Sequence, residues 1–102
     1  MSQEIDDTGS NTPEVTHLLT DFQLEVGKRI QNIREFRGIS RRELGEAIGL
    51  HGNSANTGIY AVEVSGAATR IDTIFKVAQV LGVTPGFLLD GGDLRIEHIK
   101  KF

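Results

Sequence analysis

Apolar residues recur at helical spacing along most of the chain, and no stretch alternates strongly enough to predict a strand. Residues 13–22 are predicted to form a short amphipathic helix, with Thr12 as its N-cap and Pro13 at its first position. A longer helix follows and is expected to end at Gly38, since glycine readily adopts the left-handed conformation that closes many helices. Arg37 is expected to cap the last carbonyls of this same helix. Its inward-facing residues are predicted to be Val26, Ile30, Ile33 and Phe36.

Further helices are predicted downstream, over about 41–48, 57–64, 70–81 and from 85 onward. Thr69 and Asp72 have the spacing of a capping box before the third of these helices. The residues expected to face inward are Leu44, Ala47, Ile48, Ile59, Val62, Ile71, Ile74, Phe75, Ala78, Leu81, Phe87 and Leu88. Short connections between short helices favour one compact all-α bundle.

Two arginines occupy an unusual position at the start of one predicted helix. Ser40 and Glu43 form the S-x-x-E capping box, so a helix should begin at Arg41, directly followed by Arg42. The helix dipole already makes that end partly positive, so each arginine is unfavourable there by about a few tenths of a kcal/mol. Their position is therefore better explained by something outside the helix.

Charge is divided unequally along the 102 residues, a length that fits one small domain. The net charge is -3, yet residues 1–25 carry six acidic side chains and no Lys or Arg. Residues 1–12, rich in small polar residues, are predicted to be a disordered acidic tail. The remainder is net basic, with six basic side chains between Lys28 and Arg42. Such a run fits a solvated helix face as well as a polyanion partner, so charge alone leaves both interpretations open.

Composition excludes several classes of function. Without cysteine the chain has no disulfide framework and no thiolate metal site. His17, His51 and His98 are scattered without metal-ligand spacing, so we expect no metal site. No phosphate-binding loop, dinucleotide-binding motif or catalytic triad is present, and we expect neither a cofactor nor enzymatic activity. No apolar run approaches the roughly 18 residues of a membrane span, which predicts a soluble cytoplasmic protein without membrane contact.

Two segments carry a resemblance to a known family: RGISRRELGEAIG at 37–49 and IDTIFKVAQVLGVTP at 71–85. Over roughly residues 24–90 the chain resembles the Cro/CI-type helix-turn-helix domain of phage and bacterial repressors, the lambda-repressor-like or Xre family. Leu44, Gly45, Ile48 and Gly49 stand where the family keeps packing and turn residues. The resemblance implies a five-helix lambda-repressor-like bundle, with a DNA-binding domain over 23–90, the short helix 13–22 before it and an extension over 91–102 after it.

The resemblance also implies roles for the arginines. Arg41 stands where helix N-terminal amides and a cation face a DNA phosphate. Arg42 is either a second phosphate contact or a solvated residue, and Arg70 is the phosphate candidate in the loop before the fourth core helix. Arg34 aligns with an arginine that pairs with a glutamate, here Glu63, which implies a structural ion pair rather than a DNA contact.

The turn before the recognition helix departs from the family. Ten positions separate Gly49 from Ile59, four more than is usual. Either the turn is longer, or the recognition helix gains a turn and begins near Asn53 or Ser54. Gly58 either allows close approach to the groove or marks the start of the helix. The base-reading candidates are Asn53, Ser54, Asn56, Thr57 and Tyr60, and for Tyr60 the alternative is a surface aromatic packed on its neighbour.

Three functions are compatible with this sequence. The first is a sequence-specific transcription regulator, acting as a repressor, that binds the major groove of double-stranded DNA as a homodimer, with 91–102 as a candidate pairing segment. The second is the antitoxin of a toxin-antitoxin pair, which would bind a protein partner. The third is a protein-interaction module that has lost DNA readout. A recognition helix without Lys or Arg favours the third, whereas Arg41 and the basic body favour the first.

Overall fold

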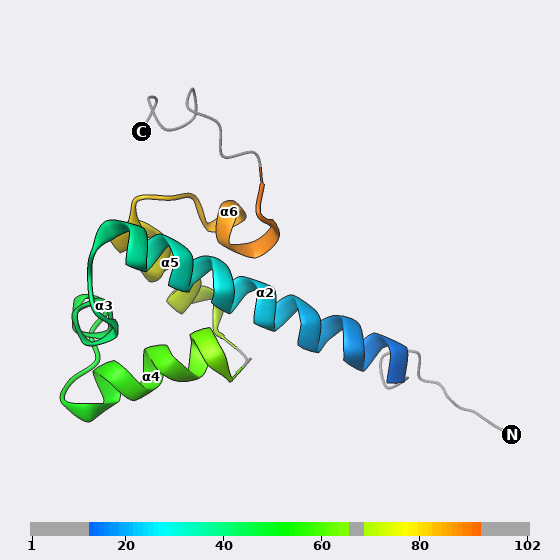
Figure 1. Ribbon diagram of the computed structural model, residues 1–102, viewed down its shortest axis with the longest axis horizontal. Coiled ribbons are helices and arrows are strands. Elements are labelled where there is room, and N and C mark those ends of the chain that lie inside the picture. Colours follow the sequence, from blue (N-terminus) through cyan, green and yellow to red (C-terminus); the bar gives the residue numbers. More distant parts are fainter. Residues whose placement is uncertain (1–12, 66–68, 93–102) are drawn as a thin grey trace, which may run out of the picture.

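The computed structural model describes residues 13–65 and 69–92, which form five helices and, within those ranges, no strand (Figure 1). The helices are α2 (Pro13–Arg37), α3 (Arg41–Ala47), α4 (Asn53–Val64), α5 (Ile71–Leu81) and α6 (Pro85–Asp90). The predicted all-α fold is confirmed. The predicted acidic tail, 1–12, and residues 93–102 of the predicted extension lie outside the described residues.

The first helix is longer than expected. The prediction of a separate helix over 13–22 is wrong, because α2 runs without interruption for 25 residues. Its single glycine, Gly27, remains helical and lies against α4, where an added Cβ would collide with the carbonyl oxygens of Val62 and Glu63. The N-terminal part of α2 projects beyond the other helices (Figure 1). Despite its length, α2 is not apolar enough to cross a membrane, and neither is any other helix in the described part of the chain.

One hydrophobic core joins the helices. α2 contacts α4, α5 and α6, and α3 packs mainly against α4. The buried core residues are Val26, Ile30, Leu44, Ile59, Ile74, Val77, Ala78, Leu81 and Leu88. Several half-buried apolar residues pack against this set, including Ile33, Ile48, Val62 and Phe87, which were predicted to face inward.

Four predicted inward-facing residues are exposed instead. Ile71 is 88% exposed and Phe75 is 53% exposed, because α5 buries the face that contains Val77. Phe36 is 79% exposed at the end of α2, where the Arg37 guanidinium lies 5.8 Å from its ring centroid. Ala47 is exposed in the last turn of α3. In each case the helix itself was predicted correctly, but the face that it packs against the core was not.

The N-terminus of α5 also differs from the prediction. The helix begins at Ile71 with Arg70, not Thr69, at the N-cap position, and it has no side-chain cap. Asp72 does not complete a capping box; its carboxylate accepts a hydrogen bond from the Thr73 N–H at 2.9 Å and from Arg70 Nε at 3.2 Å. The predicted Thr69–Asp72 box is therefore wrong.

Two arginines of α2 bind the carbonyl ends of other helices. Arg37 Nε donates to the Leu81 carbonyl at 2.8 Å, so the prediction that it caps its own helix is wrong. Arg29 Nη1 donates to the carbonyls of Leu88 at 3.2 Å and Leu89 at 3.1 Å. The last carbonyls of a helix lack intrahelical donors and form the negative end of its dipole. These two cations therefore fasten α5 and α6 to α2.

Candidate nucleic-acid interface

α3 and α4 form a tightly packed helix pair. Ser40 Oγ accepts from the Glu43 N–H at 3.0 Å, and Glu43 Oε1 accepts from the Ser40 N–H at 2.7 Å, which is a complete capping box at the start of α3. Gly45 lies against the backbone of Ala55, and a Cβ there would collide with the Ala55 carbonyl. Only glycine allows the two backbones to approach this closely.

The extra residues before α4 lengthen the helix at its N-terminus. Gly49 and Gly52 have φ values of +103° and +58°, and α4 begins directly afterwards at Asn53. Leu50, half-buried in the turn, lies over Gly58, where an added Cβ would come within 2.9 Å of its Cδ1 atom. Gly58 therefore makes room for Leu50, a role that neither sequence interpretation anticipated.

The first half of α4 presents a polar face without charge. Ala55 and Ile59 are buried against the body, whereas Asn53, Ser54, Asn56, Thr57 and Tyr60 are all exposed. The Thr57 hydroxyl donates to the Asn53 carbonyl at 2.9 Å. No charged residue occurs from Asn53 to Val62. This face can offer amides and hydroxyls to base edges, but it supplies no cation.

A buried carboxylate joins α2, α3 and α4. The Glu63 side chain is fully buried and accepts hydrogen bonds from Arg34 Nε at 2.7 Å and Arg34 Nη2 at 3.2 Å. It also accepts from Arg41 Nε at 2.9 Å. Arg34 Nη1 donates to the Ile39 carbonyl at 2.8 Å, and the hydrogen bond with Glu63 raises the pKa of Arg34 above its ordinary value. Arg34 Nη2 also lies 3.8 Å from the carboxylate of the exposed Glu35, so the two arginines of the cluster face two carboxylates.

Arg41 is held on two sides. Besides its bond to Glu63, its guanidinium lies over the Tyr60 ring, 5.1 Å from the centroid. Its side chain is 26% exposed. Tyr60 therefore packs on a neighbour and is also exposed on α4. The structure places a partly exposed cation against the aromatic residue of the polar face.

The other two candidate arginines form exposed ion pairs. Arg42 Nε lies 3.2 Å from Glu46 Oε2 one turn along α3, and Arg70 Nε lies 3.2 Å from Asp72 Oδ1. Desolvation acts to raise the pKa of Asp72, but the hydrogen bond and the charge of Arg70 outweigh it and lower that pKa below its ordinary value. Exposed pairs of this kind contribute little to stability, so a phosphate can replace either carboxylate at little cost.

Sequence reasoning missed one residue and one contact that shape this region. Leu50 is the one aliphatic side chain within the polar segment 49–54, which was a usable signal that it packs against something. The hydrogen bond between Arg41 and Glu63 had no signal in the sequence, because it depends on how α3 crosses α4. His51 is exposed, and no group of three or more His, Cys, Asp or Glu residues that could hold a metal ion occurs in the described ranges.

Comparison with known proteins agrees with this geometry. The family model HTH_3, described as Helix-turn-helix, matches residues 30–88. This range contains α3, the turn, α4, α5 and most of α6. No curated protein and no solved structure matches the chain.

Proposed function

This chain belongs to the helix-turn-helix family HTH_3, whose members are DNA-binding regulators of transcription, and on that premise we propose that it is a sequence-specific repressor that binds the major groove as a dimer. One observation carries the proposal: the exposed, polar, uncharged face of α4 lies beside a partly exposed arginine that two neighbours hold in place. In helix-turn-helix proteins the second helix of the motif enters the major groove with its N-terminal residues at the base edges.

In this proposal base reading falls to the first turns of α4. Asn56 can bind adenine with both atoms of its side-chain amide, Oδ1 accepting from N6–H and Nδ2 donating to N7, and Thr57 can contact a thymine methyl or accept from a base. The four extra residues add a helical turn to the N-terminus of α4, and this turn contains Asn53 and Ser54. The helix face that contacts base edges is therefore longer than it would be in a shorter helix. Tyr60, fixed under Arg41, contributes a phenol hydroxyl toward a phosphate or a base edge.

Phosphate contacts fall to the arginines around this face. Arg41 donates to Glu63 through Nε, and its side chain is partly exposed. Its two terminal Nη groups then remain to donate to a phosphate. Arg42 and Arg70 exchange their exposed carboxylate partners for phosphates. The same role implies action in the cytoplasm on the cell's DNA, without catalysis, metal or cofactor.

Selection from randomised DNA tests this function. The purified full-length chain is incubated with a pool of random duplexes at moderate salt, and the best enriched sequence is titrated. We expect an inverted repeat with half-sites about one helical turn apart. Arg41→Ala should weaken binding at least tenfold on every sequence, because it removes a phosphate contact and a support of Tyr60. Lys76→Ala, which removes an exposed cation on α5, is the matched control and should change little.

A second candidate function rests on the missing charge of α4. Without a cation from Asn53 to Val62, the face also suits a protein partner. If no sequence is enriched, with residues 1–12 present or removed, the repressor proposal fails and a protein-interaction module takes its place.

A further inference from the structure

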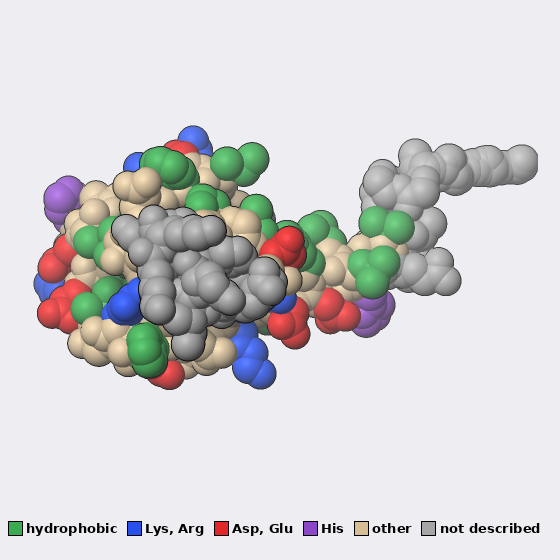
Figure 2. Space-filling model, turned by 90° about the horizontal axis from the view of Figure 1, so that it is seen from above, with side chains coloured by type: hydrophobic (Ala, Val, Ile, Leu, Met, Phe, Trp, Pro, Cys, Tyr) green, Lys and Arg blue, Asp and Glu red, His purple; other side chains and the backbone are tan. Residues whose placement is uncertain are grey.

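The projecting part of α2 carries an apolar stripe on its surface. In residues 15–25, which we call the arm, Leu18 is 68% exposed, Leu19 is 54% exposed and Phe22 is 45% exposed. Figure 2 shows hydrophobic side chains along this projection, beside acidic ones. Together with Val15, these residues span only about 100° around the helix, as at 100° per residue they follow i, i+3, i+4 and i+7.

The spacing of the stripe is that of a helix-pairing seam. Val15, Leu19, Phe22 and Val26 follow one another at intervals of four, three and four residues, which is the alternation of core positions in a coiled coil. Val26 is buried in the hydrophobic core. The seam therefore starts on the arm and runs without interruption into the body.

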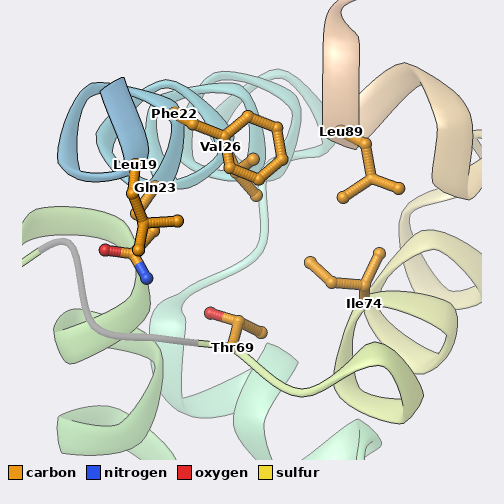
Figure 3. Close-up of a pocket in the computed structure, with 7 residues that line it drawn as sticks. All are labelled: Leu19, Phe22, Gln23, Val26, Thr69, Ile74 and Leu89. Carbon is orange, nitrogen blue, oxygen red and sulfur yellow. The ribbon is translucent and has the colours of Figure 1, made fainter. Parts of the chain in front are cut away.

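A groove lies at the base of the arm, where this seam meets the body (Figure 3). It has a volume of about 200 Å³ and is lined by Leu19, Phe22, Gln23, Val26, Thr69, Ile74 and Leu89. In Figure 3 the ring of Phe22 from α2, Leu89 from α6 and Ile74 from α5 surround the opening. The groove thus extends the apolar surface of the arm onto two further helices.

We propose that a second copy of this chain covers the arm and the groove, with the two arms antiparallel about a two-fold axis. A two-fold interface uses the same patch on both copies, so each apolar arm supplies the matching helix for the other. Only an antiparallel arrangement brings the tip of one arm to the groove at the base of the other. From Val15 to Val26 the contact is about 16 Å long at 1.5 Å per residue.

The exposed surface matches what a stable pair requires. Val15, Leu18, Leu19, Phe22 and Leu89 are each 39–68% exposed, which amounts to an apolar area on the order of 400 Å² in each copy. A standard interface takes about 800 Å² from each partner, of which a little over half is apolar. The arm and groove therefore supply most of the apolar area of such an interface.

The position of the arm suits a dimer that reads DNA. Its tip lies at the opposite end of the molecule from α3 (Figure 1). Asp21 and Glu25 are exposed on it, and residues 1–25 contain no Lys or Arg, so the arm is not a DNA contact. Pairing through the arms leaves the polar face of α4 uncovered in both copies. The inference rests on the proposed function only in that a dimeric repressor requires an interface of this kind.

Sedimentation velocity of the purified full-length chain over a range of concentrations tests the pairing. We expect a reversible dimer whose dissociation constant rises at least tenfold in both the L18D/L19D and the L18A/L19A variants. The alanine variant keeps a high helix propensity and guards against loss of the helix itself. Leu24→Asp is the matched control, because Leu24 is exposed on the opposite side of the same arm and should leave the dimer intact. Circular dichroism establishes that each variant keeps its helix content.

Other occupants of the surface give different results. If the chain stays monomeric at hundreds of micromolar, or if Leu24→Asp weakens the dimer as much as L18D/L19D does, the proposal is wrong. It is also wrong if removal of residues 93–102 abolishes the dimer while L18D/L19D does not. DNA binding separates this inference from the function: L18D/L19D should still bind a half-site weakly, whereas Arg41→Ala should remain dimeric and lose DNA.

Discussion

At the scale of single residues, Glu63 has the largest expected effect on stability. Its buried carboxylate is the counter-charge for Arg34, which is 7% exposed, and it also binds Arg41. Glu63→Gln should lower the free energy of unfolding by about 3 kcal/mol, because it leaves the buried Arg34 guanidinium with only the exposed Glu35 carboxylate, 3.8 Å away, as counter-charge. Urea unfolding followed by circular dichroism measures this difference.

The control for this prediction is another glutamate at an exposed helix end. Glu43→Gln preserves the capping box, since glutamine also accepts from the N-cap N–H, and should change stability by less than about 0.5 kcal/mol. Arg41→Ala should cost less than Glu63→Gln, because Arg34 continues to neutralise the carboxylate. Equal losses from Glu63→Gln and Glu43→Gln would contradict the structural role of the cluster.

At the scale of helices, the arginine caps on α2 are predicted to couple α5 and α6 to the rest of the fold. Arg37→Met keeps most of the aliphatic side chain but removes the donor to the Leu81 carbonyl, so it should cost about 1 kcal/mol. Arg42→Met, which breaks only an exposed pair, should cost at most about 0.5 kcal/mol. Denaturant midpoints of the two variants give the comparison, and an Arg37→Met midpoint equal to that of Arg42→Met would remove the coupling role.

These helices also mark how far sequence reasoning extends. The existence of the helices followed from periodicity, and two of their ends followed from Gly38 and Ser40. The sequence did not predict which face of α5 is buried, because apolar residues occupy most of its circumference. Packing against the other helices selects the face that contains Val77. The break expected near residue 22 was wrong, because Phe22 and Val26 continue the helical spacing and no helix-ending residue separates them.

The candidate site was also predictable only in part. The resemblance identified Arg34 and Glu63 as a pair, and the spacing of Gly49 and Ile59 limited the start of α4 to two alternatives. The stacking of Arg41 on Tyr60 and its bond to Glu63 depend on how α3 crosses α4, which no local pattern encodes.

At the scale of the whole molecule, the arrangement of charge predicts how binding responds to salt. A dimer that engages Arg41, Arg42 and Arg70 on both copies neutralises roughly six phosphates, so the logarithm of the DNA affinity should fall with the logarithm of salt concentration at a slope of about -5. The monomeric L18D/L19D variant should show about half that slope, because only one copy meets the DNA.

Removing one arginine at a time identifies the contacts within that slope. Arg70→Ala in the dimer deletes two cations and should reduce the slope by about 2 in magnitude, and Arg42→Ala should do the same if its exposed pair with Glu46 opens onto a phosphate. Affinity titrations at several salt concentrations on the selected operator supply these slopes. If Arg70→Ala leaves the slope unchanged, this arginine stays paired with Asp72 in the complex. Of the three candidate arginines, only Arg41 and Arg42 on α3 would then contact phosphates.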